Sequence, residues 1–371
     1  MTGQRKWFAL FTLGILLNTV YLSFAQASAL PPGWKTECVG FYQLSFPAEV
    51  EMALVEIDQK GERTKYHYPD GREATHSYWF RGARQVTTRQ PLSVFEKEIS
   101  VDKVDMMAYK KKLLTQGRPN TANRIQFHAE LMPETFRRDS GLGASLSMQR
   151  GGRIYNYMIE NPFPKPAQDV DPPPTVEETK WLNESVDQFL KAFRTRALFE
   201  IPPEIGRCVP YGFIAKGSKQ TRPQSDEFSA VAFRLKTHPD VEIYFMVKYS
   251  GEQDAKKELE LFWNQIPAKE LKLEGGFDNG FRAVNIAGRE GVATLVNITR
   301  EYDTVDYGYT AYVTGDDVAE KDTPNLMLYV IRTAAHTRGT PMSKKDFLKL
   351  AEQIVASVKR RVPEQPKNSV K

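Results

Sequence analysis

Two stretches far apart in this chain open with the same pattern of residues. The first is Cys38-Val39-Gly40-Phe41-Tyr42 and the second is Cys208-Val209-Pro210-Tyr211-Gly212. After each opening the same order follows: alternating apolar residues typical of β-strands, a helix, more strands, and a closing helix. A repeated order of elements indicates a duplicated unit. We therefore predict two similar α+β domains.

The expected helices come in matching pairs. Apolar residues recur at helical spacing in residues 92–115 (Phe95, Ile99, Met106, Tyr109, Leu113) and in residues 252–265 (Ala255, Leu259, Phe262, Trp263). Each closing helix begins at a cap, Thr175 to Glu178 in the first half and Ser343 to Asp346 in the second. An antiparallel sheet with an apolar face needs a layer of helices to cover it. We expect each domain to be a mainly antiparallel sheet covered by helices.

Prolines mark the domain boundary. Pro202-Pro203 follows the first closing helix, and paired prolines stop a helix and form a short, stiff link. We expect an N-terminal domain over residues 28–200 and a C-terminal domain over residues 201–371. The proline-rich stretch 161–174 is an irregular connection inside the first domain.

The first 27 residues have the features of a cleavable signal peptide. Arg5 and Lys6 precede an apolar run from Trp7 to Val20, and the small residues of 25–29 provide cleavage sites. A retained anchor is the alternative, but the run is short of the ~20 residues that span a bilayer. We expect an exported protein with no integral membrane segment after cleavage.

The charge of the chain gives little sign of a nucleic-acid partner. The formal net charge is +5, from 51 basic and 46 acidic residues, and it falls to +3 without Arg5 and Lys6. Nucleic-acid binders concentrate basic residues in a stripe, whereas here basic and acidic residues are interleaved. Hydrophobic residues at 41% and charged residues at 26% are typical of a globular protein.

Cys38 and Cys208 are the two cysteines of the chain. In an oxidising compartment they can form a disulfide, and the alternative is two separate buried thiols. Their wide spacing does not suit a metal site, and the five histidines show no ligand spacing. We expect no metal and no cofactor.

A search for catalytic motifs finds no candidate residue. Gly143-Ala144-Ser145-Leu146-Ser147 lacks the second glycine of a nucleophile elbow, and Gly141-Leu142-Gly143 is too short for a dinucleotide loop. The pairs Asp316-Asp317 and Glu177-Glu178 fit a turn and a helix start better than acid–base catalysis. The lysine run Lys110-Lys111-Lys112 is interpreted as a solvated helix face.

The surface is the remaining source of function. Several aromatic residues lie among polar neighbours: Tyr66, Tyr68, Tyr78, Trp79, Phe80, Tyr302, Tyr307 and Tyr309. Aromatic residues anchor protein–protein interfaces, but strand cores use them as well. The residues that bind a partner are not identified by the sequence.

The two openings also resemble a known family. The stretch Glu37 to Phe46, the segment Ile201-Pro202-Pro203-Glu204-Ile205-Gly206-Arg207-Cys208, the turn His238-Pro239-Asp240 and the stretch Ile286 to Gly291 are similar to the immunity proteins that neutralise a class-four type VI secretion lipase effector. The resemblance implies a two-lobed clamp in the periplasm that binds a phospholipase effector and blocks its active site. Loops between the halves are the expected contacts, and the producing cell and its sisters are protected.

Two other functions remain open. The chain could be an envelope module that binds a sugar or lipid, for which a deep aromatic-lined pocket is typical. It could also be a periplasmic hydrolase with an unrecognised site. An immunity protein needs no catalysis, so we expect that this chain is not an enzyme.

Overall fold

The computed structural model describes residues 31–47, 49–57, 63–74, 84–128, 132–141, 143–163, 172–215, 228–249, 254–274, 280–315 and 323–361. The predicted signal peptide, residues 1–27, lies outside them, as do Tyr78, Trp79, Phe80 and the pair Asp316-Asp317. The predicted α+β class with mainly antiparallel sheets is confirmed.

The larger sheet has eight strands. Their order is β16-β18-β19-β20-β15-β14-β3, with β17 paired to β18. The bounds are β3 (Val50–Met52), β14 (Phe228–Leu235), β15 (Val241–Lys248), β16 (Glu270–Leu273), β17 (Phe281–Ile286), β18 (Arg289–Thr299), β19 (Val305–Val313) and β20 (Asn325–Arg332). His238-Pro239-Asp240 lies in the connection between the antiparallel strands β14 and β15, as the sequence indicated.

A helix covers each face of this sheet. In β20, Leu328 and Val330 pack with α6 (Lys344–Ser357), whereas Tyr329 packs with α4 (Ala255–Asn264) on the other face. Because successive strand residues point to opposite faces, a strand covered on both sides is apolar at nearly every position. All eight residues of β20 are buried, as this arrangement requires.

The second sheet has seven strands in the order β5-β4-β6-β10-β9-β8-β7. The bounds are β4 (Leu54–Ile57), β5 (Arg63–His67), β6 (Arg84–Arg89), β7 (Gln126–His128), β8 (Thr135–Ser140), β9 (Gly143–Arg150) and β10 (Arg153–Glu160). The associated helices are α1 (Leu92–Thr115), α2 (Pro119–Asn123) and α3 (Val176–Ala192). In β10, Ile154 packs with Phe95 of α1, whereas Tyr155 belongs to the core that includes Phe189 of α3.

The two sheets share one strand order. The run β4-β6-β10-β9-β8-β7 corresponds to β14-β15-β20-β19-β18-β16, with each strand at the same place relative to the helices. One difference is that β4 and β6 are parallel while β14 and β15 are antiparallel. The intervening strand β5 reverses the chain once more, which accounts for the change of direction.

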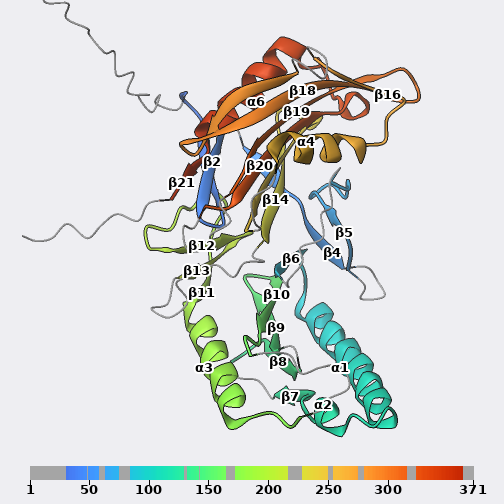
Figure 1. The fold of residues 1–371 in the computed structure, drawn as a ribbon, viewed down its shortest axis with the longest axis vertical. Helices are drawn as coiled ribbons and strands as arrows, with labels where there is room; N and C mark the ends of the chain where they lie inside the picture. The colour runs from blue at the N-terminus through green and yellow to red at the C-terminus, as the bar shows by residue number, and fades with distance from the viewer. Residues whose placement is uncertain are drawn as a thin grey trace, which may run out of the picture.

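The two sheets lie one after the other along the long axis of the molecule. Figure 1 shows α4 and α6 at one end with the eight-stranded sheet, and α1, α2 and α3 at the other end. A single large core cluster nevertheless includes residues of both halves, among them Phe46, Phe189, Ile214 and Phe245. The halves are therefore joined by packed apolar side chains as well as by the chain itself.

Candidate functional site

Two small sheets form the junction between the halves. One contains β1 (Lys35–Val39), β2 (Tyr42–Phe46) and β21 (Lys359–Arg360), and the other contains β11 (Phe193–Thr195), β12 (Gly206–Val209) and β13 (Gly212–Ala215). The opening hairpin of each half thus pairs with the strand that follows the closing helix of the other half. In addition, β3 extends the eight-stranded sheet by pairing with β14.

The junction has a pseudo-symmetric hydrogen-bond pattern. The amide of Arg361 donates to the carbonyl of Phe41 in the first hairpin, and the amide of Arg196 donates to the carbonyl of Tyr211 in the second. Between the hairpins, the amides of Gly40 and Cys208 each donate to the carbonyl of the other at 2.9 Å. The repeated sequence openings therefore become two equivalent hairpins placed side by side.

A disulfide joins the two hairpins. Cys38 of β1 and Cys208 of β12 are bonded, with their Cα atoms 5.7 Å apart. Both cysteines are buried, and they pack with Phe213. The two residues that the sequence left as a pair or as separate thiols are thus brought together, and the bond closes a loop that contains the whole seven-stranded sheet.

A fully buried ion pair lies next to the disulfide. The guanidinium of Arg196 is 2.5 Å from a carboxylate oxygen of Glu37, and both side chains have no exposed surface. Glu37 also accepts hydrogen bonds from the amides of Cys38 at 2.8 Å and Phe199 at 2.6 Å. Arg196 donates to the carbonyls of Cys38, Val209 and Gly212. A buried charge is costly unless it is paired and hydrogen-bonded, and this pair satisfies both conditions.

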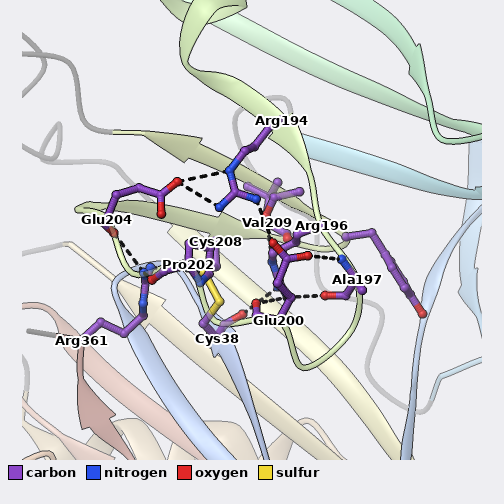
Figure 2. Close-up of polar contacts among 12 residues, drawn as sticks. Cys38, Arg194, Arg196, Ala197, Glu200, Pro202, Glu204, Cys208, Val209 and Arg361 are labelled. Carbon is purple, nitrogen blue, oxygen red and sulfur yellow. Dashed lines mark hydrogen bonds and ion pairs between the residues drawn. A yellow bond between two sulfur atoms is a disulfide. The ribbon is translucent and has the colours of Figure 1, made fainter. Parts of the chain in front are cut away.

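Arg361, which follows β21, binds next to the disulfide (Figure 2). Its guanidinium donates to the carbonyls of Pro202, Gly206 and Glu204 and lies 3.3 Å from the sulfur of Cys208. Burial, and then the nearby charge of Arg196, lower the pKa of Arg361.

Carboxylates at the rim of the junction hold Arg194. Glu200 and Glu204 each lie 2.9 Å from its guanidinium. The hydrogen bond with Glu200 is the largest of the interactions that raise the pKa of Arg194. These charged side chains of the junction each bind a neighbour within the chain, and the arrangement is suited to holding the two halves in a fixed position.

The residues considered as catalytic candidates form hydrogen bonds that stabilise the fold. Ser145 lies on β9 and accepts a hydrogen bond from Arg138 at 3.1 Å, so its neighbour is a cation and not a general base. Glu178 completes a capping box with Thr175 at the start of α3. Lys110 donates to the carbonyl of Ile125. Within the described ranges, no group of three or more His, Cys, Asp or Glu side chains could hold a metal ion.

The aromatic candidates separate by exposure. Tyr68 and Tyr309 are buried in the core, and Tyr66 and Tyr307 are partly buried. Tyr302 is 90% exposed at the turn between β18 and β19. Hydrogen bonds between Arg300 and Thr304 and between Asp303 and Arg300 close this turn, and Lys269 pairs with Asp303 at 2.6 Å. Tyr302 is therefore an exposed aromatic side chain on a well-braced turn.

A second exposed surface, which the sequence analysis missed, lies on α1. Six of the twelve large hydrophobic residues that are exposed in the described part of the chain belong to this helix. Val104 is 66% exposed, Met107 54% and Leu114 50%. These three residues and Lys111 lie on one side of the helix, because spacings of three, four and seven residues share a face. We call this set the outer stripe.

The sequence predicted one helix over residues 92–115 from apolar residues at helical spacing, and the structure shows which of them are buried. Phe95 and Leu113 are buried, whereas Tyr109 is 48% exposed. The helix touches the sheet along one narrow side. The sequence of α1 has apolar residues on two sides of the helix, and this pattern could have indicated the outer stripe.

No helix in the described residues is long and apolar enough to cross a membrane.

Residues 200–363 match the family model described as the Tle cognate immunity protein 4 C-terminal domain. Similar solved structures include the immunity protein TplEi of T6SS from Pseudomonas aeruginosa complexed with "L" peptide (TM-score 0.48, 15% identity, 89% of this chain and 99% of that chain). Another is the Tle4-Tli4 complex (TM-score 0.49, 15% identity, 89% of this chain and 98% of that chain). None of the curated protein sequences matches this chain. The match over residues 200–363 thus confirms the resemblance to this class of immunity proteins that the sequence predicted.

Proposed function

We propose that this chain is an immunity protein that binds and inhibits a type VI secretion lipase effector in the periplasm. The observation that carries the proposal is the family match over residues 200–363, because that family is named for immunity to a Tle effector. The signal peptide that the sequence predicts over residues 1–27 supports the location. The protein acts by occupying a surface of its partner and is not an enzyme.

The proposed mechanism is a two-lobed clamp. An inhibitor that contacts its target through two lobes binds tightly only if their relation is already fixed, because any ordering on binding reduces the affinity. The junction meets this requirement. The disulfide and the Glu37–Arg196 pair connect the two halves, and so do β3, β11 and β21, the exchanged strands, each of which pairs with a strand of the other half. A stable interface needs ~800 Å² from each partner, and two lobes offer more surface than one.

Tyr302 is a candidate contact of the C-terminal lobe. Tyrosine is enriched among the residues that dominate binding energy, and a braced turn keeps the side chain in one place before binding. Its exposure of 90% leaves nearly the whole ring available to a partner.

Co-purification from the periplasm tests this function. A tagged chain should be recovered there without residues 1–27, together with the lipase effector encoded beside its gene. Cells that produce the chain should survive delivery of that lipase, and cells that retain the chain in the cytoplasm should not. Survival with a cytoplasmic chain, or recovery of the tagged chain without the lipase, would count against the proposal.

A further inference from the structure

The outer stripe of α1 carries an inference about how the lipase is bound. The side of α1 that faces the sheet is fixed by several contacts. Asp102 pairs with Arg138 of β8, the ammonium of Lys103 lies 5.2 Å from the ring centre of Phe136, and Lys110 reaches the carbonyl of Ile125. These residues, with Phe95 and Leu113, define one side of the helix. The outer stripe lies on a different side, where it contacts solvent.

The spacing of the stripe matches a known mode of recognition. Val104, Met107, Lys111 and Leu114 follow one another at intervals of three, four and three residues. An amphipathic helix that lies in an apolar groove of a partner anchors itself by residues at such intervals. The long aliphatic part of Lys111 continues the apolar strip while its ammonium reaches water. Met107 is unbranched and flexible, so it fills an irregular groove well.

Other occupants fit the stripe less well. An anionic bilayer attracts helices whose polar side is rich in cations, but the five lysines of α1 are nearly balanced by Glu96, Glu98, Asp102 and Asp105, which leaves the helix a net charge of only +1. A second copy of this chain would need ~800 Å² of contact from each partner, and one side of a single helix offers much less.

A lipase must hold the acyl chain of its substrate in an apolar groove, because binding sites for apolar ligands are concave and lined by apolar side chains. We propose that the outer stripe of α1 occupies the acyl-chain groove of the lipase effector and competes there with the lipid. This inference rests on the proposed function and names the part of the lipase that the N-terminal half contacts.

A matched pair of variants tests the contact. Val104→Asp with Met107→Asp places charges on the stripe. Tyr109→Asp makes the same kind of change on α1, at a residue that is also exposed but lies off the stripe. The double variant should raise the Kd for the lipase at least about tenfold, whereas Tyr109→Asp should change it less than about twofold. Both variants should unfold at about the same temperature as the wild-type chain, because the substituted side chains are exposed.

Competition with the wild-type chain tests the groove without any variant. A non-hydrolysable phospholipid analogue with long alkyl chains, used below its micelle concentration, should raise the apparent Kd at least about tenfold. The same headgroup without the chains should leave it unchanged. Equal binding by the double variant and the wild type, or no effect of the long-chain analogue, would overturn the inference. If the double variant loses vesicle binding or self-association but still binds the lipase, the inference is also wrong. A wild-type chain that fails to bind the lipase would overturn the proposed function itself.

Discussion

At the junction, a few buried residues hold the two halves in one position relative to each other. Glu37 and Arg196 have no exposed surface, and Glu37 comes from the first hairpin while Arg196 follows β11. The pair replaces the water that each charge loses. Removing one partner therefore leaves a charge that the surrounding protein solvates only in part.

Glu37→Gln should lower the free energy of unfolding by about 3–5 kcal/mol, because it leaves Arg196 charged, buried and without its carboxylate. Arg194→Gln is the matched control at the rim, where the arginine side chain is 39% exposed. Breaking that pair should cost less than about 1 kcal/mol. Urea unfolding of both variants measures the difference, and equal losses would show that burial of the ion pair has no special weight.

His336 should make the stability of the protein sensitive to mild acid. Burial, and then the positive charge of Arg72, lower the pKa of His336. Below the ordinary histidine pKa of about 6.5, the unfolded chain takes up a proton that the folded protein resists. Stability should therefore fall as the pH drops from 7.5 to 5.5. His336→Gln should reduce that fall by about 1 kcal/mol or less, since the ring is partly exposed. An identical pH dependence in the variant would exclude His336 as a contributor.

The helices are the elements that the sequence defines best. The ends of α1 and α4 lie within a few residues of the predicted ranges, and α3 and α6 begin at the predicted caps, because caps and helical spacing are local signals. The amide of Glu178 donates to the hydroxyl of Thr175 at 3.0 Å, and the amide of Thr175 donates back to the carboxylate of Glu178 at 2.7 Å. The capping box thus gives hydrogen-bond partners to two of the amides at the start of α3.

Thr175→Ala should lower the free energy of unfolding by about 1 kcal/mol, because it leaves the amide of Glu178 without its cap. The nearby Thr179→Ala change keeps the capping box and should cost less. Thermal unfolding of the two variants separates the effects, and a larger loss for Thr179→Ala would mean that the cap has little part in fixing α3.

The exchanged strands could not be predicted in the same way. β3 has three residues and β21 has two, and their partners lie far away in sequence. Short apolar runs carry no information about which strand they join, since tertiary packing decides the pairing. The pairing of Cys38 with Cys208 was equally open, because spacing alone does not bring two cysteines together. The outer stripe was missed because exposure depends on how narrowly α1 meets the sheet.

At the scale of the whole molecule, the disulfide and the shared core join the two halves. The bond joins residues separated by 170 positions in the sequence. Closing a loop of that length restricts the unfolded chain, which stabilises the folded state by about 5 kcal/mol in the chain-entropy model. The main core cluster includes side chains from both sheets, while a smaller cluster under α4 belongs to the C-terminal half alone and one under α1 to the N-terminal half alone.

Replacing both cysteines with alanine should therefore lower the free energy of unfolding by about 2–5 kcal/mol. Addition of a reductant should produce a similar loss in the wild-type chain and none in the double variant. Denaturant unfolding with and without reductant measures both effects. An unchanged midpoint in the double variant would mean that the exchanged strands hold the junction without the bond.

Titration of the lipase with the processed chain examines the proposed inhibition most directly. Hydrolysis of phospholipid by the effector encoded beside this gene should fall linearly as the chain is added and stop near one equivalent. The chain alone should release no fatty acid. Undiminished hydrolysis at excess chain, or lipid turnover by the chain itself, would show that it does not act as an inhibitory partner of the lipase.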